Sequence, residues 1–234
     1  MSKKKKIILI FVCLFLLFAG LVGYSVYKDI RMENQLKKEI FAIDDLVKNT
    51  ESFNTTEFNK RINRTVTRGD YAKVEKAVKN YLKDSVANLR EITETLKDDR
   101  IVNLLTVENY SNDGPEFNST KAYITECRDK LNNELNTYYG FFTKEKIMSY
   151  LDTKDLDSYY TDLYLKELIG DYEKEFADKT LEGSLKELIT LLDNSEKIID
   201  FLINNKDQWY IEGENIVFKT DALLTEYNNL VANL

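Results

Sequence analysis

Residues 7–27 read IILIFVCLFLLFAGLVGYSVY, a run of 21 residues without a charged side chain. A helix of that length spans roughly 31 Å at 1.5 Å per residue, which matches the hydrocarbon core of a bilayer. The run therefore predicts one transmembrane helix, and Ile7 to Tyr27 are expected to contact the lipid bilayer.

The charges beside this run predict its orientation. Lys3–Lys6 stand immediately before it, whereas residues 28–39 mix four basic with three acidic side chains. Cytoplasmic flanks carry the excess of lysine and arginine, so residues 1–6 are expected to form a cytoplasmic tail. The expected location is the cell membrane, crossed once, with the C-terminal domain extracytoplasmic.

A cleaved secretory signal peptide is the alternative interpretation, because it also combines a basic start with an apolar run. The apolar region of a signal peptide is usually about 7–15 residues long, whereas this run weakens only after Val22. The residues Gly23-Tyr24-Ser25 also make a poor cleavage site. An uncleaved signal-anchor helix is therefore the favoured interpretation.

Composition limits the function classes. The chain is 43% hydrophobic and 31% charged, a balance typical of a folded globular protein. Residues 28–234 hold all 40 acidic and 29 of the 33 basic residues, a net charge of −11, so nucleic acid is not an expected partner. The chain has no histidine, and Cys127 is the only cysteine after the apolar run. Neither an internal disulfide there nor a transition-metal site is expected, and no cofactor is predicted.

Helical spacing of apolar residues dominates residues 28–234 and predicts a mainly α-helical domain. Residues 28–48 are expected to continue the membrane helix as a juxtamembrane stalk, and residues 49–234 to form the extracytoplasmic domain. Two long helices show the clearest bundle-type spacing. Their apolar residues are Tyr71, Val74, Val78, Tyr81, Leu89, Ile92 and Leu96 in the first, and Leu181, Leu185, Leu188, Leu192, Ile199 and Leu202 in the second.

Shorter elements fill the remaining chain. Thr55 or Thr56 is expected to cap a short helix. Pro115 next to a glycine predicts the main loop of the domain over residues 108–117. The helix that follows this loop has Cys127 in its apolar stripe, so this thiol is expected in the core.

Residues 208–219, QWYIEGENIVFK, change the period from helical to alternating and predict a β-hairpin with a connection at residues 212–215. Alternation places Trp209 and Ile211 on one face of the first strand, and Ile216 and Phe218 on one face of the second. An isolated hairpin is marginally stable in water, so this apolar face is expected to pack on the flanking helices. The predicted fold class is therefore mainly α: a single N-terminal transmembrane helix followed by an extracytoplasmic helical bundle with one small C-terminal β-hairpin.

Two acidic clusters are candidate calcium ligands, at residues 112–116 (NDGPE) and 152–157 (DTKDLD). An EF-hand needs glycine at its sixth position and glutamate at its twelfth, but counting from residue 152 gives Asp157 and Leu163. Helix capping and turn formation explain both clusters better. No metal ligand is assigned.

Aromatic residues supply the candidate partner-binding residues. Eight tyrosines and phenylalanines fall within residues 138–164. Such side chains line recognition surfaces as well as cores. The residues assigned to a candidate partner-binding surface are Tyr159, Tyr160, Tyr164 and Trp209.

No catalytic motif is present, so no enzyme activity is predicted. The expected function is a membrane-tethered interaction or scaffold protein of a bacterial cell envelope, with a protein partner there and self-association as a further option. One alternative is an extracytoplasmic ligand-binding sensor or accessory subunit that acts through a membrane partner. Another is an envelope hydrolase that uses two carboxylates, which would need two facing, desolvated acids in a cleft.

Overall fold

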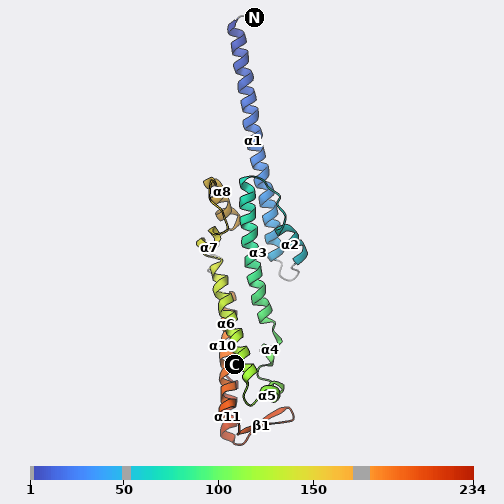
Figure 1. The fold of residues 1–234 in the computed structure, drawn as a ribbon, viewed down its shortest axis with the longest axis vertical. Helices are drawn as coiled ribbons and strands as arrows, with labels where there is room; N and C mark the ends of the chain where they lie inside the picture. The colour runs from blue at the N-terminus through green and yellow to red at the C-terminus, as the bar shows by residue number, and fades with distance from the viewer. Residues whose placement is uncertain (1–2, 49–53, 171–179) are drawn as a thin grey trace. The chain divides into compact units, whose positions relative to one another are not determined.

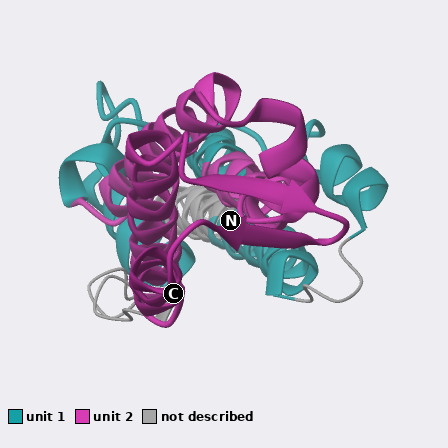
Figure 2. Ribbon diagram, turned by 90° about the horizontal axis from the view of Figure 1, so that it is seen from below, with its two compact units in different colours: residues 1–84, 144–171 teal, residues 85–143, 172–234 magenta. Residues whose placement is uncertain are grey.

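The computed structural model describes residues 3–48, 54–170 and 180–234, with the side chains of residues 3–25 and 180 excepted. The described chain is mainly helical and ends in a small two-stranded antiparallel hairpin and a final helix (Figure 1). It divides into two compact units (Figure 2). Unit 1 is residues 1–84 and 144–171, and unit 2 is residues 85–143 and 172–234.

Helix α1, Lys3–Lys48, runs without interruption in Figure 1, which confirms the predicted helical continuation to Lys48. The side chains of the predicted transmembrane segment lie outside the described residues as far as Ser25. In the described part of the chain, no helix combines the length and apolarity needed to cross a membrane. The transmembrane helix therefore stays a prediction.

Unit 1 is built on the second half of α1. Its other elements are α2 (Thr55–Ile62), the first part of α3 (Asp70–Leu96), α7 (Lys144–Met148), α8 (Ser158–Asp162) and the π-helix η2 (Leu163–Leu168). Its buried apolar residues include Leu36, Ile40, Ile43, Phe58, Val74, Val78, Ile147, Leu163 and Tyr164. The segment predicted as a stalk thus supplies core residues. The domain boundary predicted at residue 49 falls in residues 49–53, outside the described residues.

Unit 2 is a set of helices closed by the hairpin. Its elements are the rest of α3, α4 (Asp99–Asn103), α5 (Val107–Asp113), α6 (Asn118–Gly140), α10 (Thr180–Asn204), β1 (Trp209–Glu212), β2 (Asn215–Phe218) and α11 (Asp221–Val231). One core cluster joins these elements and includes Ile92, Tyr110, Phe117, Ile124, Cys127, Leu131, Leu185, Leu192, Ile199 and Leu202. The core position predicted for Cys127 is confirmed, and burial raises the pKa of its thiol.

The hairpin has the predicted alternation. Trp209 pairs with Phe218 and Ile211 with Ile216, and all four pack against the unit 2 core. Glu212 pairs with Asn215, so two residues rather than four connect the strands. Gly213 lies at a φ of +62°, which glycine adopts without the steric cost of a Cβ.

The prediction of a loop over residues 108–117 is wrong for residues 108–113, because Val107–Asp113 forms helix α5. The Thr106 hydroxyl caps this helix by accepting a hydrogen bond from the amide of Asn109. The side chain of Tyr110 is buried, which anchors this short helix to the core. The cap of α2 also differs from the prediction, since the side chain of Asn54 accepts from the amide of Glu57.

Candidate functional site

Unit 1 contains a cluster of charged residues in which two glutamates and one lysine are buried, while their two arginine partners are partly accessible to water. We call Glu39, Arg61, Arg64, Glu75 and Lys79 the buried ionic cluster. Glu39 comes from α1 and Glu75 and Lys79 from α3, and these three residues are only 1–4% exposed. Arg61 lies in the last turn of α2 and Arg64 follows this helix, so the cluster connects α1 to α2 and α3.

The Glu39 carboxylate has three cationic partners. Arg61 Nη1 donates to its Oε2 at 3.0 Å and Arg64 Nε to its Oε1 at 2.7 Å. Lys79 Nζ lies 3.3 Å from Oε1. Burial by itself would raise the pKa of Glu39, but hydrogen bonds from Arg64 and the charge of Lys79 outweigh it and hold the pKa below its usual range.

Glu75 acts as an anchor for the chain between α2 and α3. Its carboxylate accepts hydrogen bonds from the amides of Val66 and Thr67 at 2.9–3.0 Å and from the Thr67 hydroxyl at 2.7 Å. Lys79 Nζ donates to Glu75 Oε1 at 2.7 Å and to the Arg64 carbonyl at 2.8 Å. Buried polar groups are costly unless satisfied, and these groups have their partners.

Sequence reasoning missed this cluster, although a signal was present. Glu75 and Lys79 stand four residues apart and each follows an apolar residue, Val74 or Val78, that belongs to the predicted seam. Charged residues at such positions are expected to be paired when the helix face is buried. The periodicity does not say that their partners come from α1.

The three predicted tyrosines all lie in unit 1, but with different exposures. Tyr159 is 47% exposed, and its hydroxyl donates to Glu33. Tyr160 packs edge-on against Tyr71, with ring centroids 4.9 Å apart. Tyr164 is fully buried, and its hydroxyl donates to the Ile147 carbonyl at 2.7 Å. Tyr159 is therefore the one of the three that presents a large surface.

The fourth predicted residue, Trp209, belongs to unit 2. Its indole Nε1 donates to the Leu202 carbonyl at 2.8 Å, at the C-terminal part of α10. Its ring stacks on Phe117 at 6.0 Å between centroids and lies 6.4 Å from the ring of Tyr110. These contacts give Trp209 a packing role in the unit 2 core.

The side chains of the candidate calcium clusters make helix-capping and turn contacts. Asp157 accepts from the amide of Tyr159 at the start of α8, and Asp152 accepts from the amide of Lys154. Asp113 accepts from the amides of Ser119 and Thr120 at the start of α6. Within the described residues, no group of three or more potential ligands could hold a metal ion.

Comparisons of the chain with protein-family models, with curated proteins and with solved structures find no match. The strongest structural feature of unit 1 is the attachment of α1 to α2 and α3 through apolar burial and the buried ionic cluster.

Proposed function

We propose that this protein is a membrane-tethered interaction or scaffold protein of a bacterial cell envelope, without catalytic activity of its own. In this proposal, residues 7–27 anchor the chain, and both units lie on the outer side of the membrane. The uncharged run and the four lysines before it support the anchor and its direction. The net charge of −11 after the run favours a cationic protein or peptide as the partner.

One observation carries the proposal: the helix that contains the proposed anchor is also a core helix of unit 1. Leu36 and Ile43 are fully buried and Glu39 is ion-paired from three sides, so the distal part of α1 is held firmly in the unit. A flexible linker would let a tethered domain turn freely, whereas a continuous helix is a stiff connection. Unit 1 would therefore be held at a defined height above the bilayer, as a scaffold requires.

The buried acids favour this role over the hydrolase alternative. Among the described residues, Glu39 and Glu75 are the buried carboxylates, and each is bonded to Lys79. A general acid needs a raised pKa, but the pKa of Glu39 is lowered. Ion pairing of this kind suits a structural junction better than acid catalysis.

Protease accessibility in cells stripped of their wall tests the proposal. Added protease is expected to digest residues 28–234 and to leave a short membrane-bound stub. A matched variant with Lys3–Lys6 replaced by glutamate is expected to lose the uniform orientation, because the lysines set it. Complete protection of the native chain while a known outer-face protein is digested would reject the proposed topology.

A further inference from the structure

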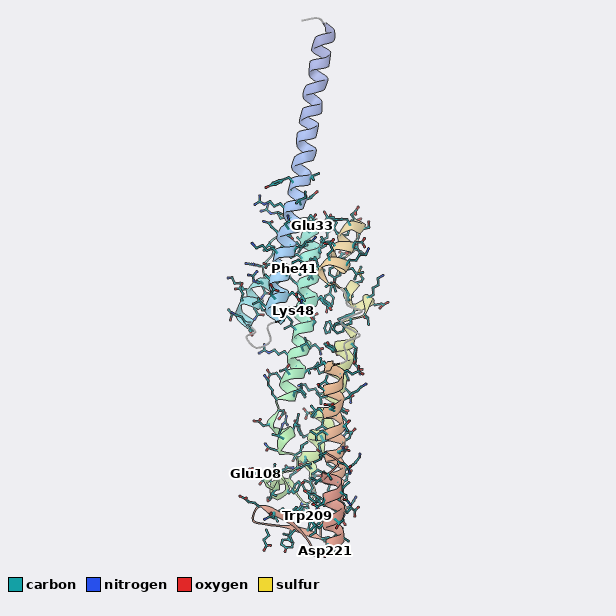
Figure 3. All side chains as sticks on the ribbon, turned by 180° about the vertical axis from the view of Figure 1, so that it is seen from behind. Glu33, Phe41, Lys48, Glu108, Trp209 and Asp221 are labelled. Atoms are coloured by element: carbon teal, nitrogen blue, oxygen red, sulfur yellow. The ribbon has the colours of Figure 1, made fainter. Side chains whose placement is uncertain are left out.

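Residues 26–48 are the part of α1 whose side chains the structure describes. One side of this part, opposite the side that packs in the unit 1 core, is exposed. Tyr27, Ile30 and Phe41 are 63%, 55% and 49% exposed, and Asn34 between them is also exposed. We call these four residues the exposed α1 face. Their side chains share one side of the helix because they are spaced by three, four and seven residues. Figure 3 labels Phe41 on α1 between Glu33 and Lys48.

A shallow pocket of about 340 Å³ lies on this face, lined by Tyr27, Ile30, Arg31, Asn34, Gln35 and Lys38. Its first four residues are spaced i, i+3, i+4 and i+7. Four residues in this spacing form the hole that receives one side chain of a facing helix in a coiled coil. With Tyr27 at heptad position a, Ile30 occupies d, Arg31 occupies e, and Asn34 and Phe41 are the next two a positions.

We propose that the exposed α1 face is the dimer interface of this protein, occupied by a second copy of the same helix running parallel to the first. In a parallel two-stranded coil, the residue at d enters the hole formed by positions a, d, e and a of the facing helix. The partner's Ile30 therefore fills the hole that Tyr27, Ile30, Arg31 and Asn34 form. By two-fold symmetry, each helix offers the other the same hole and the same side chain.

The length of the face argues against lipid as its sole occupant. Phe41 lies 14 residues beyond Tyr27, about 21 Å along the helix. The headgroup region of one leaflet is only about 5–8 Å thick, so lipid that covers Tyr27 and Ile30 does not reach Phe41. This step rests on the proposed anchor, which also places both copies in the same orientation and at the same height.

Two sequence features in the same heptad frame fit a second copy. Asn34 is a polar residue at position a, which in coiled coils selects parallel pairing and register at some cost in stability. Earlier in the chain, Gly20 and Gly23 take positions a and d, where small residues allow close approach of membrane helices.

Disulfide crosslinking in the full chain, in membranes, tests the interface. Cys13 also falls at position a, so the background carries Cys13→Ser. Asn34→Cys is expected to give a disulfide-linked dimer on mild oxidation, whereas the neighbouring Gln35→Cys, at position b, is expected to stay monomeric. Adding Ile30→Glu to Asn34→Cys is expected to abolish the crosslink without changing the helix content, because Ile30 is exposed in unit 1.

Equal crosslinking at positions 34 and 35, or none at 34, would overturn the dimer. The same samples separate this failure from failure of the anchor. A membrane-bound chain that does not crosslink rejects the dimer alone. Recovery of the protein in the soluble fraction would reject the anchor. In that case, a crosslink of the Asn34→Cys variant in the soluble fraction would still support the dimer interface, and its absence would reject it.

Discussion

Glu39 is 4% exposed and forms ion pairs with three cationic residues of α2, α3 and the chain between them. These ion pairs hold α1 against the rest of unit 1. Glu39→Gln should destabilise unit 1 by about 3–5 kcal/mol, because it leaves Lys79 and two arginines without their shared anion. Hydrogen exchange measured by mass spectrometry should show faster exchange of the amides in α2 and in the chain before α3.

Glu57→Gln is the matched control. Glu57 also pairs with Arg61, at 2.9 Å, but its side chain is 31% exposed. Exposed pairs contribute little, so the change should cost less than about 1 kcal/mol. Equal effects of the two substitutions would contradict the special role of Glu39.

Gly114 and Gly183 should respond oppositely to alanine. A Cβ at Gly114 would lie 2.4 Å from the Tyr110 carbonyl oxygen and 3.0 Å from Trp209 Cη2, whereas one at Gly183 in α10 would meet nothing within 4 Å. Gly114→Ala should therefore destabilise unit 2 by about 1–3 kcal/mol through overpacking. Gly183→Ala should stabilise it by about 0.5–1 kcal/mol, since alanine favours a helix. Thermal unfolding followed by tryptophan fluorescence measures the stability of both variants. A Gly114→Ala variant more stable than the native protein would contradict the close packing of Gly114 against Tyr110 and Trp209.

At the scale of elements, the hairpin and α11 form one packed corner of unit 2. Phe218 on β2 contacts both Phe201 of α10 and Tyr227 of α11, with centroids 6.0 and 5.1 Å apart. The hydroxyls of Tyr227 and Tyr110 lie 3.0 Å apart, which links α11 to α5. Figure 3 labels Trp209 on β1 and Asp221 at the start of α11. The hairpin therefore closes the core rather than standing free.

Trp209→Ala should destabilise unit 2 by about 3 kcal/mol, the low end for a buried tryptophan, because this ring is partly exposed. The change also removes the hydrogen bond to the Leu202 carbonyl. Tyr210→Ala, on the outer face at 48% exposure, should cost far less. Denaturant unfolding followed by circular dichroism compares them. In the native protein, tryptophan emission at the wavelength of fully hydrated indole would speak against the packed hairpin.

At the scale of the whole molecule, the position of a truncation should decide whether unit 1 folds. Removing residues 1–25 leaves Leu36, Glu39, Ile40 and Ile43 in place, so the remaining chain should stay helical, and a low amount of protease should cut it more slowly than a chain that lacks residues 1–48. Removing residues 1–48 deletes these four buried residues and should open unit 1, because α2 and α3 lose their apolar and ionic partner. Limited proteolysis measures the contrast. Equal resistance of both truncations would show that α1 is dispensable to the unit.

The sequence by itself determined the helical class, the extent of most long helices, the hairpin and its buried face. These features follow from the spacing of apolar residues within each element, which does not depend on which other elements that element packs against. The same spacing marked Cys127 and the α6 stripe as core. The local sequence gave the wrong prediction at residues 107–113. Turn-forming residues are helical there, because the side chain of Tyr110 packs in the core.

Only the tertiary structure decided which polar residues meet. Glu39 and Lys79 are 40 residues apart in sequence, and Tyr110 and Tyr227 are 117 apart. No local period encodes such pairs, because each side chain is matched only after its helix has packed. For the same reason Tyr164 and Tyr159, five residues apart, end as a core residue and a surface residue.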